Sequence, residues 1–148
     1  MRPRYCTPAD RLKEADVLSR FAAVLRRYNP GFAWEAKHVS GDADYDGVIL
    51  KDGKISHIVE IKNRTGAGER FDTWHIAKDK LDRCLAAARS KGVEFILLMV
   101  WDGFIYSILG KNIPQNDLRQ GGRTDRNDPH DVEVMVHIPM EKFTRCTA

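Results

Sequence analysis

The 148-residue sequence predicts an α/β protein in which a mixed central β-sheet lies between helices, in three layers. Two segments carry apolar residues at helical spacing, and six shorter segments are apolar or alternating and are bounded by turn residues. They follow one another along the chain in the order α-β-β-β-α-β-β-β. Because the length is that of one ordinary domain, we expect residues 1–148 to form a single domain.

The first helix is expected to begin at Thr7, a suitable N-cap, or at Pro8, which fits the first helical position. Its apolar face is formed by residues at helical spacing, namely Leu18, Phe21, Ala22 and Leu25. The breaker Asn29-Pro30-Gly31 should end this helix.

Three strands are expected next, over residues 32–39, 45–50 and 55–62. The second and third are joined by Lys51-Asp52-Gly53-Lys54, whose Asp-Gly pair is typical of a tight hairpin. Alternate residues of a strand point to opposite faces, so Glu60 and Lys62 are predicted to share one face of the third strand.

The second half of the chain repeats the alternation of helix and strand. We expect a helix over 73–91, a buried strand over 95–100 and its hairpin partner over 104–108. The remaining segments are predicted as a long polar loop, a last strand and a short closing helix, at residues 110–131, 132–138 and 140–143.

Composition excludes several classes of protein. An apolar fraction of 43% is too high for a disordered chain. The longest apolar run, 95–101, is too short to span a membrane. The three cysteines form no C-x-x-C pair, which argues against a disulfide framework or a cysteine zinc site. We therefore expect an intracellular, cytoplasmic protein with no membrane partner.

Charge is unevenly distributed along the chain, although the net charge is only +3. Residues 1–28 and 62–91 each carry an excess of four basic side chains, whereas 35–60 carries an excess of three acidic ones. Basic flanks around an acidic centre suit a protein that binds a polyanion and positions a cation. An ordinary solvated charged surface explains the same composition equally well.

The acidic centre contains a candidate metal site. The hairpin can bring Asp46 opposite Glu60, and two carboxylates at that range raise one another's pKa unless a cation lies between them. Oxygen ligands favour magnesium or manganese over zinc. Lys62, beside such a metal, could orient a water molecule or stabilise charge that develops on a phosphate.

A further acidic residue is expected from the first helix. Glu14 lies four residues before Leu18, on the same apolar face, whereas Asp16 lies on the more solvated side. A glutamate on the packing face of a helix needs a cation or a hydrogen-bond partner. We therefore select Glu14 rather than Asp16 as the candidate.

Asp46-Gly47-Val48-Ile49 followed by Val59-Glu60-Ile61-Lys62 resembles the core motif of the PD-(D/E)XK nuclease superfamily. The resemblance implies a restriction-endonuclease-like αβββαβ core over about residues 8–108, with C-terminal strands added. The proline of the motif's name is absent, since Tyr45 precedes Asp46. The family pattern implies that Asp46, Glu60 and the backbone carbonyl of Ile61 bind magnesium and that Lys62 assists the attacking water. It also implies that Glu14 is the acid that many members carry on the first helix, and we expect it to be a further metal ligand.

Members of the superfamily also carry a basic or polar side chain on the second helix that reaches the active site. We select Lys80 for that role, with Lys78 as second choice. Arg64 and His75 lie close to the end of the motif strand and are candidate contacts to nucleic acid. For His75, a capping or solvated histidine is the favoured interpretation.

The resemblance implies a magnesium-dependent nuclease, with manganese as a possible substitute, that hydrolyses DNA in repair, recombination, junction resolution or a phage-type process. Three alternatives are retained: a non-catalytic nucleic-acid-binding module, a structural protein, and an amphipathic hairpin with a surface Glu60–Lys62 salt bridge. We expect a homodimer, because cutting two strands requires two active sites. The 110–131 loop is expected to contact DNA.

Overall fold

The computed structural model describes residues 8–39, 43–64, 72–122 and 132–146. Thr7, one of the two predicted starts of the first helix, lies outside the described residues. The helices and strands are α1 (Pro8–Tyr28), β1 (Trp34–His38), β2 (Gly47–Lys51), β3 (Lys54–Arg64), β4 (Thr73–Ala77), α2 (Lys78–Lys91), β5 (Glu94–Trp101), β6 (Phe104–Leu109), β7 (Leu118–Gly122), β8 (Val132–Pro139) and β9 (Thr144–Arg145), with 3₁₀ turns η2 (Gly110–Asn112) and η4 (Met140–Lys142).

The central sheet has the strand order β1-β2-β3-β5-β6-β9. Its β3–β5 pair is parallel and its other pairs are antiparallel, so the predicted mixed sheet is confirmed. The two hairpin turns require positive φ angles, which Asp52 and Gly53 adopt in one and Asp102 and Gly103 in the other. These are the Asp-Gly pairs from which the hairpins were predicted.

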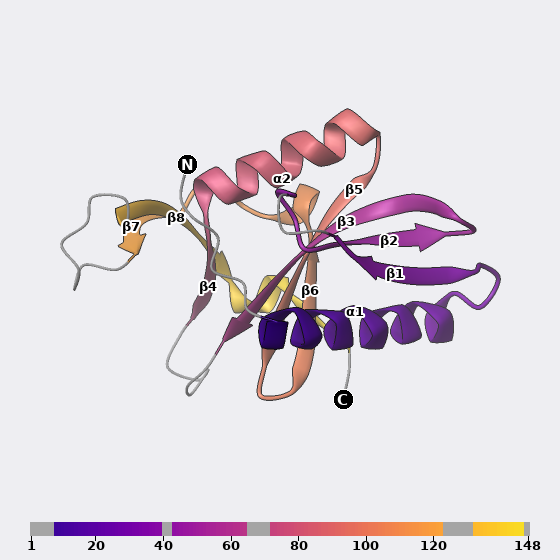
Figure 1. Ribbon diagram of the computed structural model, residues 1–148. Helices are drawn as coiled ribbons and strands as arrows, with labels where there is room; N and C mark the ends of the chain where they lie inside the picture. Colours follow the sequence, from indigo (N-terminus) through magenta and orange to yellow (C-terminus); the bar gives the residue numbers. More distant parts are fainter. Residues whose placement is uncertain (1–7, 40–42, 65–71, 123–131, 147–148) are drawn as a thin grey trace.

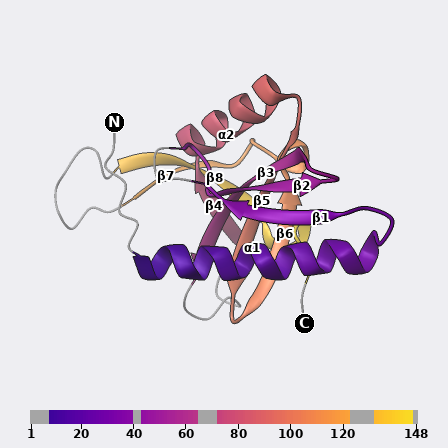
Figure 2. The same cartoon turned by 45° about the vertical axis from the view of Figure 1, so that its right-hand side comes forward.

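The two long helices lie on opposite faces of the central sheet, as Figure 1 and Figure 2 show. The α1 side is filled by one apolar cluster that includes Leu18, Phe21 and Ile61. The α2 side is filled by a second cluster that includes Leu81 and Leu97. The three-layer prediction is therefore confirmed, and residues that alternate along β3 face two different cores.

A second, three-stranded sheet with the order β4-β8-β7 was not expected. The prediction of helix over 73–77 is wrong, because these residues form β4 and α2 begins at Lys78. Trp74 and Ile76 are buried while their neighbours are half-exposed, which is the two-residue period of a strand. The last predicted strand, β8, pairs with β4 here and not with the central sheet.

The prediction of one long loop over 110–131 is also wrong in part. This segment contains η2 and the strand β7, which pairs with β8 from Leu118 to Gly122. Residues 123–131 lie outside the described part. No helix of the described residues is long and apolar enough to cross a membrane.

Candidate active site

The β2–β3 hairpin places Asp46 beside Glu60. Gly47 pairs with Val59, and the amide N–H of Asp46 donates to the carbonyl oxygen of Val59 at 2.9 Å. The side chain of Asp46 is fixed in turn, because the amide N–H of Ile61 donates to its Oδ2 at 2.8 Å. The predicted position of Asp46 across the hairpin from Glu60 is therefore confirmed.

Glu60 is a buried carboxylate between two lysines. It is 4% exposed and is the one buried polar or charged residue of the described part of the chain. The Nζ atoms of Lys62 and Lys80 each lie 3.6 Å from it, on Oε2 and Oε1 respectively. Oε1 has no hydrogen-bond partner within the described residues.

Burial, together with the neighbouring charge and hydrogen bond of Asp46, raises the pKa of Glu60 to about 8. The two lysines lower this pKa, but they do not cancel the cost of burial. Near neutral pH the pair of carboxyl groups therefore keeps a proton. A divalent cation in the same place would replace that proton and allow both groups to ionise.

The donor set fits a hard divalent cation. Asp46 and Glu60 present carboxylate oxygens side by side, and the buried Oε1 of Glu60 accepts no hydrogen bond from the described residues. No three Asp, Glu, His or Cys side chains converge elsewhere in the described ranges, nor does a third one join this pair. The remaining ligands of a metal here would be backbone carbonyls and water, which magnesium commonly keeps.

The two lysine candidates of α2 differ in their surroundings. Lys80, 14% exposed, reaches Glu60 from the second helix, as the family pattern implies for such a residue. Lys78 instead forms an exposed i,i+4 ion pair with Asp82, 3.0 Å away. The structure thus brings Lys80, and not Lys78, to the carboxylates.

Glu14 lies on the α1 side of the central sheet, whereas Glu60, Lys62 and Lys80 lie on the α2 side. The side chain of Glu14 is 15% exposed and its Oε2 lies 2.6 Å from Nε2 of His38. His38 pairs with Gly47, the residue after Asp46, so Glu14 lies near the motif hairpin. Asp16 is largely exposed and pairs with Arg20. No described contact joins Glu14 to Asp46 or Glu60, and its role as a metal ligand stays a prediction.

Gly47 explains how α1 can approach the hairpin. A Cβ at this position would lie 2.7 Å from Leu18 Cδ1 and 2.9 Å from the carbonyl oxygen of Lys37. Only a residue without a side chain therefore lets α1 pack on the sheet directly beside Asp46. The glycine of the Asp-Gly-Val-Ile motif is a packing requirement.

Arg64 and His75 lie together at the end of β3. Arg64 Nη2 donates to the carbonyl oxygen of His75 at 2.6 Å, and the His75 ring lies 5.2 Å from that of His137. Burial, with the charge of Arg64 next, lowers the pKa of His75 to about 4. The interpretation of His75 as a helix-capping residue is wrong, because it belongs to β4, where its side chain is half-buried.

Two histidines near the candidate site were missed from the sequence. His38 contacts Glu14, and His137 accepts or donates a 2.8 Å hydrogen bond with Thr73 Oγ1. Their partners lie 24 and 64 residues away, and no local spacing signals such contacts. The position of His38 at the end of β1 could have been noticed, since that strand pairs with the motif strand.

A mixed sheet between two helices, with Asp46 beside a buried Glu60 and Lys62, is the arrangement of a PD-(D/E)XK nuclease. The chain belongs to the family described as "Phage putative PDDEXK endonuclease", which matches residues 1–146. It is therefore a member of a family of nucleases. No protein of curated function matches the chain significantly.

Two solved structures show the same fold. One is Hjc, a Holliday junction resolvase of Archaeoglobus fulgidus, with 15% identity, a TM-score of 0.50 and coverage of 86% of this chain and 85% of that one. The other is D212, a nuclease from a fusselovirus, with 15% identity, a TM-score of 0.53 and coverage of 96% and 90%. At this identity the likeness shows the restriction-endonuclease-like fold, as predicted.

Proposed function

We propose that this protein is a magnesium-dependent endonuclease that hydrolyses phosphodiester bonds of DNA. The observation that carries the proposal is the position of Glu60, a buried carboxylate between two lysines and beside Asp46, whose Oε1 accepts no hydrogen bond from the described residues. Ionising a buried carboxyl group beside another carboxylate is costly, and a cation bound between the two groups would offset that cost. The structural similarity to Hjc, a Holliday junction resolvase, supports DNA as the substrate.

In the proposed mechanism, Asp46, Glu60 and the backbone carbonyl of Ile61 hold magnesium, or manganese in its place. A divalent cation held by these residues would supply Lewis-acid stabilisation of the scissile phosphate and would lower the pKa of a water molecule bound to it. Lys62, half-exposed and 3.6 Å from Glu60, orients the attacking water and stabilises the charge that develops on the phosphate. Lys80 offsets the charge of Glu60 from the buried side.

The contacts to DNA in this proposal come from Arg64 and the basic flanks of the site. They bind the phosphate backbone and read no sequence. A homodimer with two such sites would cut both strands of a duplex or of a branched substrate. His75 is held neutral near pH 7 by its surroundings, so it contributes hydrogen bonding and not charge.

The test is a panel of linear, nicked, branched and single-stranded DNA, with RNA as a comparison, incubated with magnesium. Asp46→Asn and Lys62→Met should each lower the cleavage rate by about a hundredfold or more. Lys54→Met, at the exposed hairpin turn, is the matched control and should cleave normally. Full activity in both site variants would remove this mechanism, and DNA binding without any cleavage would favour the non-catalytic module.

A further inference from the structure

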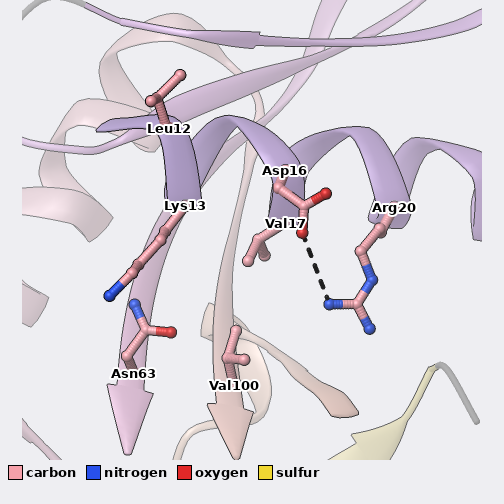
Figure 3. Close-up of a pocket in the computed structure, with 7 residues that line it drawn as sticks. All are labelled: Leu12, Lys13, Asp16, Val17, Arg20, Asn63 and Val100. Carbon is pink, nitrogen blue, oxygen red and sulfur yellow. Dashed lines mark ion pairs between the residues drawn. The ribbon is translucent and has the colours of Figure 1, made fainter. Parts of the chain in front are cut away.

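A cluster of cationic and imidazole side chains lies at the end of β3, on the same face of the sheet as the candidate active site. Glu60, Lys62 and Arg64 alternate along β3, so their side chains share the α2 face of the central sheet. Asn63, between the last two, points the other way, into the open groove beside α1 that Figure 3 shows. Arg64 therefore continues the row formed by Glu60 and Lys62.

Two histidines of the second sheet adjoin Arg64. His75 on β4 and His137 on β8 are paired across the strands, and their rings lie 5.2 Å apart. The carbonyl oxygen of His75 accepts a 2.6 Å hydrogen bond from Arg64 Nη2. Burial lowers the pKa of His75, and the nearby charges of Arg64 and Lys62 add to that effect. The cluster of Arg64, His75 and His137 is therefore close to Lys62 in space.

The cluster lacks a matching anion among the described residues. The Nε–H of Arg64 is buried and has no hydrogen-bond partner there, and no described acid pairs with this side chain. Burial, with the charge of Arg119 next, lowers the pKa of His137. Asp117 opposes this effect, but its carboxylate is already paired with Arg119 at 2.9 Å. A buried N–H group without an acceptor, among positive charges, indicates a site for an anion from outside the chain.

His137 is placed to donate a hydrogen bond to such an anion. Its Nδ1 forms a 2.8 Å hydrogen bond with Thr73 Oγ1, which leaves Nε2 for another partner. The threonine hydroxyl can donate to a neutral imidazole or accept from a protonated one. His137 can therefore gain a proton without losing this hydrogen bond. Within the described residues, the other titratable or charged groups that face it are His75 on β4, Arg64 on β3, and Asp117 and Arg119 at the start of β7.

We propose that Arg64, His75 and His137 bind a second phosphate of the DNA strand, about one nucleotide from the phosphate that is cleaved, and that this binding adds a proton to His137. Two residues of a strand advance by about 6.6 Å, which is of the order of one step along a phosphate backbone. Arg64 supplies a fixed charge, His75 a neutral hydrogen bond, and His137 a charge that is present when the phosphate is bound. The proposal rests on the proposed DNA nuclease function.

The sign of the pH dependence follows from the bound charge. A phosphodiester is an anion throughout the neutral range, so its presence raises the pKa of His137. The complex then holds more protons than the free protein, and affinity for DNA increases as pH falls.

Binding measured in EDTA, so that no cleavage occurs, tests this dependence. Fluorescence anisotropy with a duplex that carries a pH-insensitive dye would be recorded from about pH 7.5 to about pH 5.5 at constant ionic strength. Wild-type affinity should rise about fivefold, since a histidine pKa that is higher by one in the complex permits a gain of up to about tenfold. His137→Gln should change less than about twofold, because glutamine keeps a hydrogen bond and has no proton to gain. His57→Gln, a half-buried histidine near the other end of β3, is the matched control and should follow the wild type.

Two further measurements do not depend on the affinity at one pH. In NMR titrations, the ring signal of His137, assigned by its loss in His137→Gln, should have its midpoint at higher pH when the duplex is present. Arg64→Met should reduce the slope of log affinity against log salt by about 0.9, and Arg64→Lys should recover it by restoring the charge. The double variant Lys62→Met/Arg64→Met should lose about 1.8, because the two side chains contact different phosphates.

The inference would be overturned by a wild-type affinity that is independent of pH, by tightening that His137→Gln retains, or by a His137 midpoint that DNA does not move. A double variant that loses no more slope than Lys62→Met alone would assign both side chains to one phosphate and remove the second site. If the wild type cleaves no DNA in magnesium or manganese while these binding results hold, the nuclease proposal fails and the phosphate site stands.

Discussion

Glu60→Gln should stabilise the metal-free protein at alkaline pH. The pKa of Glu60 is about 8 in the folded protein, against an ordinary value of 4.5, so the folded state holds a proton that the unfolded chain has released. The contribution of this group to the free energy of unfolding is complete below pH 4.5 and is lost as pH rises toward 8. The loss between these limits is about 4 kcal/mol, from about 1.4 kcal/mol per pKa unit.

Urea unfolding in EDTA, at intervals from about pH 4.5 to 8.5, would measure this effect. The wild type should lose stability relative to Glu60→Gln across this range, because a neutral glutamine has no proton to release. Glu35→Gln, an exposed glutamate on β1, is the matched control and should follow the wild type. Parallel curves for the wild type and Glu60→Gln, differing by less than about 1 kcal/mol across the range, would refute the assignment of the proton to Glu60.

Magnesium provides the second arm of the same experiment. A cation that binds the ionised carboxylates stabilises the folded wild type by mass action, and Glu60→Gln lacks one of those ligands. At about pH 8 the addition of magnesium should therefore raise the unfolding midpoint of the wild type more than that of the variant. Equal shifts would place the metal elsewhere.

The remaining predictions concern packing, assembly and the basic side chains. Gly47→Ala should lower the free energy of unfolding, measured with urea, by about 1–3 kcal/mol, because the new Cβ would lie 2.7 Å from Leu18 Cδ1. Gly31→Ala is the control and should leave it unchanged, because no atom lies within 4 Å of that Cβ. Lys80→Met should lower the magnesium-dependent cleavage rate more than Lys78→Met, whose lysine pairs with Asp82. Light scattering at micromolar concentration should give twice the 16.9 kDa chain mass, and the monomer mass with and without DNA would contradict the homodimer. Deletion of residues 121–128 should weaken DNA binding, and unchanged affinity would assign the 110–131 segment no role.

The elements predicted well are those whose signals are local. Residues that are neighbours in the sequence are enough to predict three of these features. They are the Asp-Gly turns at 52–53 and 102–103, the strand β3 and the apolar strand β5. Regular pairing continued from the turn at 52–53 would set Asp46 opposite Val59, but a β-bulge between Ile49 and Leu50 shifts the register by one residue and brings Asp46 to Glu60. Spacing therefore predicted that Asp46 and Glu60 lie close together across the hairpin, whereas the bulge that sets them side by side leaves no signal in the turn residues.

The errors fall where long-range pairing decides the structure. Thr73–Ala77 precedes a helix whose apolar spacing is compatible with an earlier start, and only the pairing with β8, about 60 residues later, makes it a strand. Pairing with β8 also makes Leu118–Gly122 the strand β7, although the composition of this polar segment is typical of a loop. The contact between Glu14 and His38 also spans separate elements and leaves no local pattern.

The end of β3 presents different side chains on the two faces of the central sheet. Lys62 faces the α2 side with Glu60, and Asn63 faces the α1 side, because strand residues alternate. The motif therefore fixes one face of the strand end, and the packing of α1 shapes the other.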